Sequence, residues 1–248
     1  RADGSSKFAP GNKWGYFPSG GISWQLGREK FMDKFKSFLS EAKLRASYGL
    51  TGNNRVSDFA YESELRILGS TRTIWGNQAI NGLGVQTIYN PNLTWETAST
   101  LDLGLELSFL KNKFNLEVGY YNKKTYDLLL NSTISSNSGF TSANQNIGNI
   151  RNTGLEISFS STNISKGSFY WNTSMNISFN RNRLLSLANN QESRIDNSTS
   201  GAFSADFSTG FYIAKLGQPV ALFYGYVYDG LYQVSDFDVS ANGTASSY

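Results

Sequence analysis

The sequence predicts an all-β protein, an antiparallel transmembrane β-barrel segment, on three observations. Apolar and polar side chains alternate over long stretches, aromatic residues gather near the ends of these stretches, and the connections alternate between short and long. From Leu101 to Phe109 every odd position is apolar and every even position is polar or glycine. Because successive side chains of a strand point to opposite faces, this segment has one apolar face and one wet face.

The same alternation returns in residues 114–121, 154–160 and 169–180. A water-soluble β-sandwich shows this pattern too, so strand length is the second criterion. A transmembrane barrel strand needs about 9 to 11 residues to cross the hydrocarbon layer at a tilt, whereas soluble strands most often have about 5 to 6. The segments here are long enough to cross.

Aromatic residues lie near the strand ends, as at Trp14, Trp24, Tyr120 and Trp171. Amphipathic rings take this place at a membrane interface. An aromatic share of 15% supplies enough rings for two girdles. The distribution favours a membrane barrel over a soluble sandwich.

The connections form the third observation. Residues 111–113 and 165–168 are tight turns, while 132–148 and 184 to about 220 are long and rich in Ser, Asn and Gly. Short turns on one side and long loops on the other are typical of an outer-membrane barrel, whose short side is periplasmic.

The elements follow in chain order. We expect a strand over residues 14–26, a short amphipathic helix over 29–42 and a strand over 44–50. The helix is either a cap on the periplasmic rim or a membrane-surface helix. Residues 51–93 form the longest connection, in which 59–68 and 85–89 can make a hairpin outside the membrane. Loops of this length are usually functional, and four patterned strands follow over 94–183.

Composition excludes several classes of function. The 248 residues include neither Cys nor His. Their absence removes disulfides, thiolate chemistry and His-dependent nucleophilic sites, and it makes zinc binding improbable. We therefore expect that the protein binds no cofactor and is not an enzyme. A net charge of +3 without a basic cluster gives nucleic acid no binding face. No apolar run is long enough for a spanning helix. The chain shows no export signal and ends in polar, loop-like sequence, so we expect it to be a piece of a longer protein.

Six ordered strings span nearly the whole chain and resemble the barrel region of SusC/RagA-type TonB-dependent transporters of the Bacteroidetes outer membrane. The strings are RADGSSKF (1–8) with NKWGYFPS (12–19), LRASYGLTGN (44–53), NPNLTWE (90–96), NIGNIRNTGLE (146–156), FYGY (223–226) and YDGLYQ (228–233). Ordered together, they are far more specific than any single one.

The resemblance implies a large barrel of about 22 strands, filled by an N-terminal plug, coupled to TonB and covered outside by a SusD-like lipoprotein. Such transporters import glycans or peptides. The plug, the TonB box and the closing strands are expected outside residues 1–248, because six or seven spanning strands cannot close that barrel. Open edges in lipid leave backbone groups unsatisfied.

Two groups of residues are candidate sites. Arg45, Glu106, Glu117 and Glu156 should face the lumen, where they either pair with neighbouring charges and hold the plug or line a substrate path. Tyr61, Trp75, Tyr89 and Trp95 lie in or beside the longest loop. They either stack on a ligand or lid protein, or pin the loop to itself.

Two other functions stay open. A passive porin or adhesin barrel would share the strands without a plug or TonB dependence. A carboxylate-only enzyme on a soluble β-sandwich would need two acids about 5 to 9.5 Å apart in a cleft. The glycan or peptide importer in the outer membrane is the prediction that accounts for the most observations.

Overall fold

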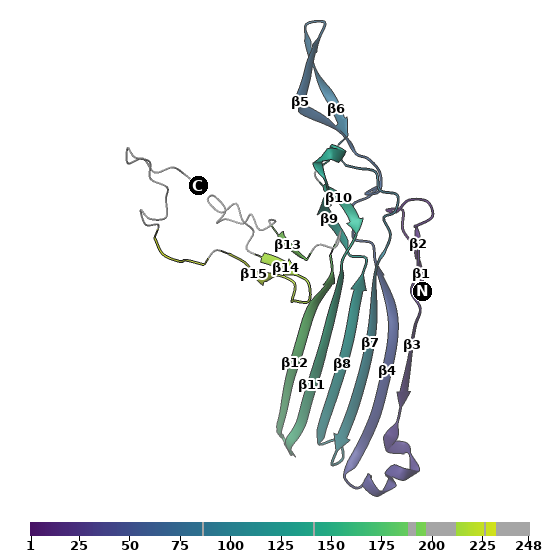
Figure 1. Cartoon of the computed structure of the whole chain (residues 1–248). Helices are drawn as coiled ribbons and strands as arrows, with labels where there is room; N and C mark the ends of the chain where they lie inside the picture. The colour runs from purple at the N-terminus through teal and green to yellow at the C-terminus, as the bar shows by residue number, and fades with distance from the viewer. Residues whose placement is uncertain (86, 141, 188–191, 197–211, 226, 232–248) are drawn as a thin grey trace.

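One antiparallel sheet of six strands dominates the computed structural model, which describes all residues except 86, 141, 188–191, 197–211, 226 and 232–248. Spatial order follows chain order, so the sheet is a meander (Figure 1). Its strands are β3 (Ser19–Trp24), β4 (Leu39–Asn53), β7 (Glu96–Phe109), β8 (Phe114–Tyr126), β11 (Asn149–Lys166) and β12 (Phe169–Ser186).

The five long strands have between 13 and 18 residues. Each exceeds the roughly 9 to 11 residues that cross a bilayer. The four strands predicted over residues 94–183 are confirmed as β7, β8, β11 and β12. In the described residues β3 and β12 are the edges of an open sheet, so the chain forms a section of barrel wall.

The strand register keeps apolar and polar side chains on separate faces. Leu103 on β7 lies opposite Ala46 on β4 and Tyr120 on β8. Tyr120 lies opposite Leu155 on β11, which in turn lies opposite Phe179 on β12. This row therefore crosses five strands on one face. We call that face the outer face and the opposite, polar face the inner face.

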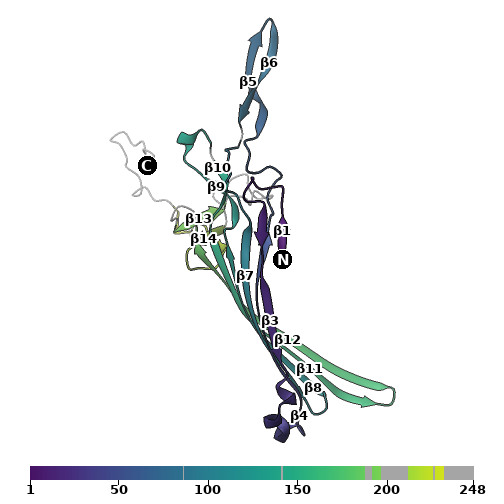
Figure 2. The same cartoon turned by 90° about the vertical axis from the view of Figure 1, so that its right-hand side faces the viewer.

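The outer face is bare in the described structure. Leu103, Ile177 and Phe179 are all exposed, and the figures show a single curved layer (Figure 2). A β-sandwich would cover this face with a second sheet, whereas the six long and short strands of this sheet form one layer in Figure 2. No helix among the described residues has the length and apolar content to span a membrane.

The two ends of the sheet differ in their connections. At one end, β7 and β8 are joined by residues 110–113, with Leu110, Lys111 and Asn112 at positive φ, and β11 and β12 by a turn with Gly167 at φ 58°. At the other end the connections are long and carry hairpins. The predicted alternation of short turns and long loops therefore holds for the connections from β4 to β12, whereas residues 25–38 between β3 and β4, at the short-turn end, form a longer connection with two 3-10 turns.

The hairpin predicted within residues 51–93 exists with different bounds. It consists of β5 (Leu65–Trp75) and β6 (Gln78–Val85), and it stands beyond the long-loop end of the sheet (Figure 1). Its turn falls at Gly76 and Asn77, which both have positive φ, the conformation that two-residue hairpin turns require. Gly and Asn tolerate this conformation best, which places the turn here.

The other long connections carry short strands. Between β8 and β11 lie β9 (Leu129–Thr133), a 3-10 turn (Ser136–Ser138) and β10 (Ser142–Asn146). After β12 come β13 (Ser193–Asp196), β14 (Tyr212–Lys215) and β15 (Leu222–Phe223). Much of the predicted loop 184–220, and part of the string 228–233, lie outside the described residues.

The helix predicted over residues 29–42 is wrong. Only two 3-10 turns form, Leu26–Arg28 and Lys30–Phe35, and β4 already begins at Leu39. Ala42 pairs with Leu107 of β7, so the last residues of the predicted helix, 39–42, belong to a strand instead. Tertiary context overrides local propensity here.

The strand predicted over residues 14–26 is interrupted at Pro18. It divides into β2 (Trp14–Tyr16), which pairs with β1 (Ala2–Gly4), and β3. Proline has no N–H to donate to a ladder. Its carbonyl still accepts a hydrogen bond from the Leu50 N–H at 2.9 Å, which keeps the chain beside β4.

A small buried cluster lies at the long-loop end, formed by Phe8, Phe17, Leu93 and Trp95. The Trp95 ring centroid is 5.4 Å from that of Phe8 and 5.5 Å from that of Phe17. Asn146 holds the adjoining backbone, since its side chain donates to Thr94 O and accepts from Thr94 N, both at 2.8 Å. This cluster anchors the loops to the top of the sheet.

Candidate functional site

A network of ion pairs crosses the inner face over three strands. Lys43 on β4 lies 3.1 Å from Glu106 on β7, measured from Nζ to Oε2. Arg45 Nε is 3.4 Å from Glu106 Oε1, and the Arg45 guanidinium also pairs with Glu117 on β8. The arginine therefore joins two carboxylates on neighbouring strands. Each of these side chains retains between 28% and 49% exposure, so the network faces open space.

Gly104 makes this crossing feasible. It lies opposite Arg45 in the register, and a Cβ built on it would collide with the Arg45 side chain. Because that position carries no side chain, Arg45 can lie across β7 and reach Glu117. Gly104 thus leaves the space in which the Arg45 side chain lies.

A second glycine is used in the same way between β8 and β12. The Tyr121 hydroxyl donates to Asn180 Oδ1 at 2.8 Å. The Tyr121 ring passes over Gly154 on the intervening β11, where a Cβ would overlap it. The inner face is therefore linked across alternate strands by polar bridges.

Glu156 stands apart from the network. It lies opposite Gly119 on β8 and Ser178 on β12. It is exposed, and within the described part of the chain no ion pair involves it. Sequence reasoning therefore placed four residues on one face, of which the structure links Arg45, Glu106 and Glu117.

Sequence reasoning missed Lys43, the fourth member of the network. The signal was available, because residues 43 and 45 share a face of β4. Glu41, Glu106 and Glu117 also line a groove of about 270 Å³ together with apolar residues such as Leu116. Across the described residues, no group of three or more acidic side chains could hold a metal ion.

The four loop aromatics do not form one site. Trp95 is only 8% exposed and belongs to the buried cluster, where its Nε1 donates to Lys13 O at 3.3 Å. Tyr61 is half-buried at the edge of that cluster. Both side chains therefore pack against other protein residues in this region.

Trp75 and Tyr89 are the exposed members of the group. Trp75 is 76% exposed and ends β5 at the tip of the outer hairpin, and Tyr89 is 58% exposed. Desolvation raises the pKa of the Tyr61 hydroxyl. A hydrogen bond with the Glu62 side chain raises this pKa further, as do the charges of Glu62 and Tyr89. Of the four aromatic residues, Trp75 and Tyr89 are the two whose rings are open to solvent.

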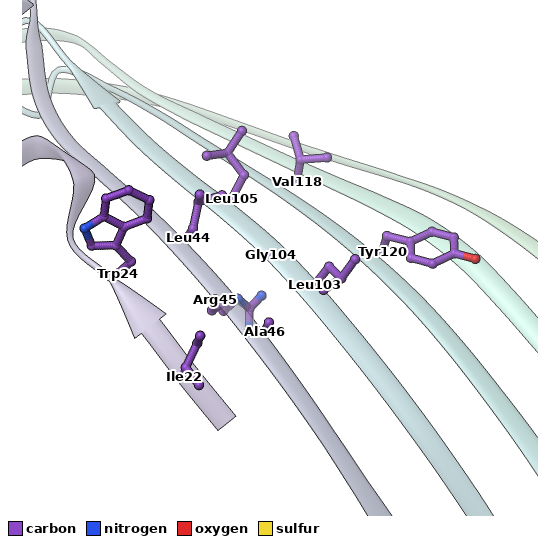
Figure 3. Close-up of a pocket in the computed structure, with 10 residues that line it drawn as sticks. All are labelled: Ile22, Trp24, Leu44, Arg45, Ala46, Leu103, Gly104, Leu105, Val118 and Tyr120. Carbon is purple, nitrogen blue, oxygen red and sulfur yellow. The ribbon is translucent and has the colours of Figure 1, made fainter. Parts of the chain in front are cut away.

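The outer face has an apolar groove of about 470 Å³ where β3, β4, β7 and β8 pass side by side. Trp24, Leu44, Leu105 and Tyr120 line it, as Figure 3 shows. A groove lined by hydrocarbon on an exposed face has the chemistry of a lipid contact.

A curved antiparallel sheet with strands of this length, an apolar outer face, a polar inner face, short turns at one end and long loops at the other defines a wall section of an outer-membrane β-barrel. Comparison with known proteins then identifies the family. The family model described as "TonB dependent receptor-like, beta-barrel" matches residues 1–248. The chain belongs to this family of bacterial outer-membrane receptors and transporters.

Several relatives are similar to the chain over most of its length. TonB-dependent receptor P3 of Formosa agariphila is 39% identical over 99% of the chain, which corresponds to 24% of the receptor. TonB-dependent receptor SusC of Bacteroides thetaiotaomicron is 32% identical over 92% of the chain and 23% of its own length. The chain spans about a quarter of these relatives.

The fold is similar to a solved structure. The RagAB peptide importer in its "closed-closed" state superposes with a TM-score of 0.77 at 25% identity, covering 99% of the chain and 26% of the importer chain. The resemblance to SusC/RagA-type transporters is therefore confirmed, as are the Bacteroidetes relatives and the outer-membrane location.

Proposed function

We propose that the whole protein imports large nutrients, oligosaccharides or peptides, across the outer membrane in a TonB-dependent way together with a SusD-like lipoprotein. The observation that carries this proposal is the match of the entire chain to the receptor barrel family. A passive porin or adhesin would not depend on TonB, so membership of this family favours the importer over these alternatives. The role is transport, with no catalytic step.

In this proposal, residues 1–248 are one section of the barrel, and the plug, the TonB box and the closing strands belong to other parts of the whole protein. The open edges of β3 and β12 support it, because unpaired backbone groups in lipid cost several kcal/mol each. The intact mass of the protein isolated from outer membranes should lie far above 27.4 kDa. A mature protein of only 27.4 kDa would contradict the proposal that residues 1–248 are one section of a larger barrel.

The inner-face network is proposed to contact the plug. Arg45, Glu106 and Glu117 present paired charges that a polar plug surface can hydrogen-bond, and the exposed Glu156 carboxylate is left for a cation of the plug or of the substrate path. Charge reversal at Glu156 should change plug accessibility to protease in the whole protein. An unchanged digestion pattern would assign Glu156 to solvent alone.

The exposed loop rings are proposed to meet the lid protein or the incoming ligand. Trp75 and Tyr89 offer flat apolar area with a polar edge, which suits sugar faces and peptide side chains alike. Trp75→Ala and Tyr89→Ala should weaken uptake or lipoprotein capture about tenfold. Tyr61→Phe, which keeps the half-buried ring, is the matched control and should leave both unchanged.

The test of the function uses the whole protein with its neighbouring lipoprotein in a Bacteroidetes host that lacks its own copy. Uptake of labelled oligosaccharides and of labelled peptides is measured with TonB present and after its deletion. We expect uptake of one substrate class to be lost without TonB. Uptake that continues unchanged would make the protein a passive pore and overturn the proposal.

A further inference from the structure

A row of cations crosses three strands on the outer face near the long-loop end. Lys124 on β8 lies opposite Arg151 on β11, which lies opposite Arg183 on β12. Arg181 precedes Arg183 by two residues on β12 and shares its face. We call these four residues the basic row.

Two side-chain hydrogen bonds confirm that the basic row lies on the outer face. Arg151 Nε donates to Asn122 Oδ1 at 3.0 Å, and Asn122 shares the parity of Tyr120 on the outer face of β8. Asn182, of the opposite parity, bonds Asn152 on the inner face. The basic row therefore shares a face with Leu155 and the other apolar rows.

Acidic residues are absent from the outer-face positions of the five long strands that the structure describes. All acidic residues of these strands lie on the inner face, namely Glu41, Glu96, Asp102, Glu106, Glu117 and Glu156. Within the described ranges no ion pair involves a residue of the basic row, and Arg181 and Arg183 are exposed. Among the residues that the structure describes, the row is therefore a cluster of positive charge without an ion-pair partner.

Its position relative to the membrane is set by the apolar rows beside it. On β12 the apolar residues run from Phe169 to Phe179, roughly 34 Å along the strand and about 26 Å across a membrane at a tilt of about 40°. That matches the height of about 25 Å for an apolar barrel band. Arg181 and Arg183 follow immediately beyond it, at the level of the lipid headgroups on the long-loop side.

We propose that the basic row binds the phosphate of an anionic lipid in the extracellular leaflet of the outer membrane. Arginine presents a planar fork that pairs bidentately with phosphate, and three adjacent strands offer several such donors at one height. Lysine and arginine near a membrane surface reach the headgroup layer while their stems lie along apolar neighbours. The apolar rows below would contact the acyl chains of the same lipid.

The proposal does not depend on what the protein imports. A lipid phosphate bound to the row would hold the barrel at a fixed height in the membrane. Lys166, the remaining outer-face cation of the long strands, lies at the short-turn end opposite Phe169 and is separated from the row by the full apolar band.

The test measures lipid binding to the whole protein in an uncharged detergent by native mass spectrometry. The probes are monophosphoryl lipid A and the same lipid without phosphate. We expect the phosphorylated lipid to bind at least tenfold more tightly. The triple variant Lys124→Gln, Arg151→Gln, Arg183→Gln should lose about fivefold in affinity per charge, equivalent to about 1 kcal/mol each.

Two matched controls test the location of the site. Lys123→Gln removes the cation adjacent in sequence to Lys124 but on the inner face, and Lys166→Gln removes the outer cation at the other end. Both should bind the phosphorylated lipid as the unmodified protein does. Equal loss in either control, or full binding by the triple variant, would overturn the proposal.

Inorganic phosphate distinguishes a lipid site from a site for free anions. At millimolar concentration it should not displace the lipid, because it lacks the acyl chains that the apolar rows contact. Complete displacement would assign the row to soluble phosphate and refute the lipid assignment. If the triple variant does not fold, as judged by its heat-modifiable gel mobility, the single variant Arg183→Gln serves in its place with an expected fivefold loss.

Discussion

The buried cluster and the outer face of the sheet use the same kinds of side chain in opposite ways. Phe8, Phe17, Leu93 and Trp95 are buried against one another and against partly buried hydrophobic neighbours such as Leu50 and Tyr61. On the outer face, Leu103, Phe179 and their neighbours remain bare across a single layer. The difference teaches that the cluster obtains its stability from protein packing, whereas the sheet obtains it from the bilayer.

The largest effect is expected at the cluster. Trp95→Ala should lower the local free energy of opening by about 3–5 kcal/mol, because it removes a large buried ring and leaves a cavity. Hydrogen exchange of the backbone amides around Leu93 in the whole protein measures this. Trp75→Ala, at the exposed hairpin tip, should stay within about 0.5 kcal/mol. Equal effects at both tryptophans would remove the contrast.

The outer face should respond to charge. Leu105→Arg, in the middle of the apolar band, is expected to destabilise the barrel in lipid by about 2–4 kcal/mol, because it places a cation near the bilayer midplane. Urea titration of the whole protein in phospholipid vesicles measures the change. Ser178→Arg is the control, since its inner-face position lies opposite Glu156. A smaller cost at Leu105 than at Ser178 would reverse the two faces.

A smaller effect is expected on the inner face. Gly104→Ala should push Arg45 away from Glu117 and abolish their coupling, worth about 1 kcal/mol or less for a pair this exposed. A double-mutant cycle with Glu117→Gln detects it. Gly119→Ala is the matched control, since a Cβ there meets open space. Coupling that survives Gly104→Ala would show that the arginine does not need the glycine.

The smallest effect is expected for the pair at the network's edge. Lys43→Gln should cost about 0.2–1 kcal/mol, and the cost should shrink as salt is added, because exposed ion pairs are screened. Urea titrations at low and high salt provide the measurement. A cost that is independent of salt would mean that Lys43 contributes through packing of its stem rather than through charge.

Most of the wall could be predicted from the sequence, because a period of two residues that persists over long segments is typical of strands and does not suit a helix. Leu101 to Phe109 and its partner strands keep the predicted faces in the structure. The helix at residues 29–42 failed because pairing of Ala42 with Leu107 is a contact distant in sequence that local spacing cannot reveal.

The candidate sites were predictable in part for the same reason. Parity placed Arg45, Glu106 and Glu117 on one face, but only the register shows that Arg45 passes over Gly104. Trp95 looked like its exposed neighbours because burial in a loop depends on packing against Phe8 and Phe17, far away in the sequence. The basic row was missed since its cations are spread over three strands.

The meander order keeps the six-stranded sheet separate from the hairpin of β5 and β6. Each long strand pairs with the next long strand along the chain, and β4 pairs with β7 although the hairpin of β5 and β6 lies between them in the sequence. The strands β5 and β6 pair with each other in a separate two-stranded sheet, so changes in the length or sequence of this hairpin are expected to leave the backbone partners of the six-stranded sheet in place.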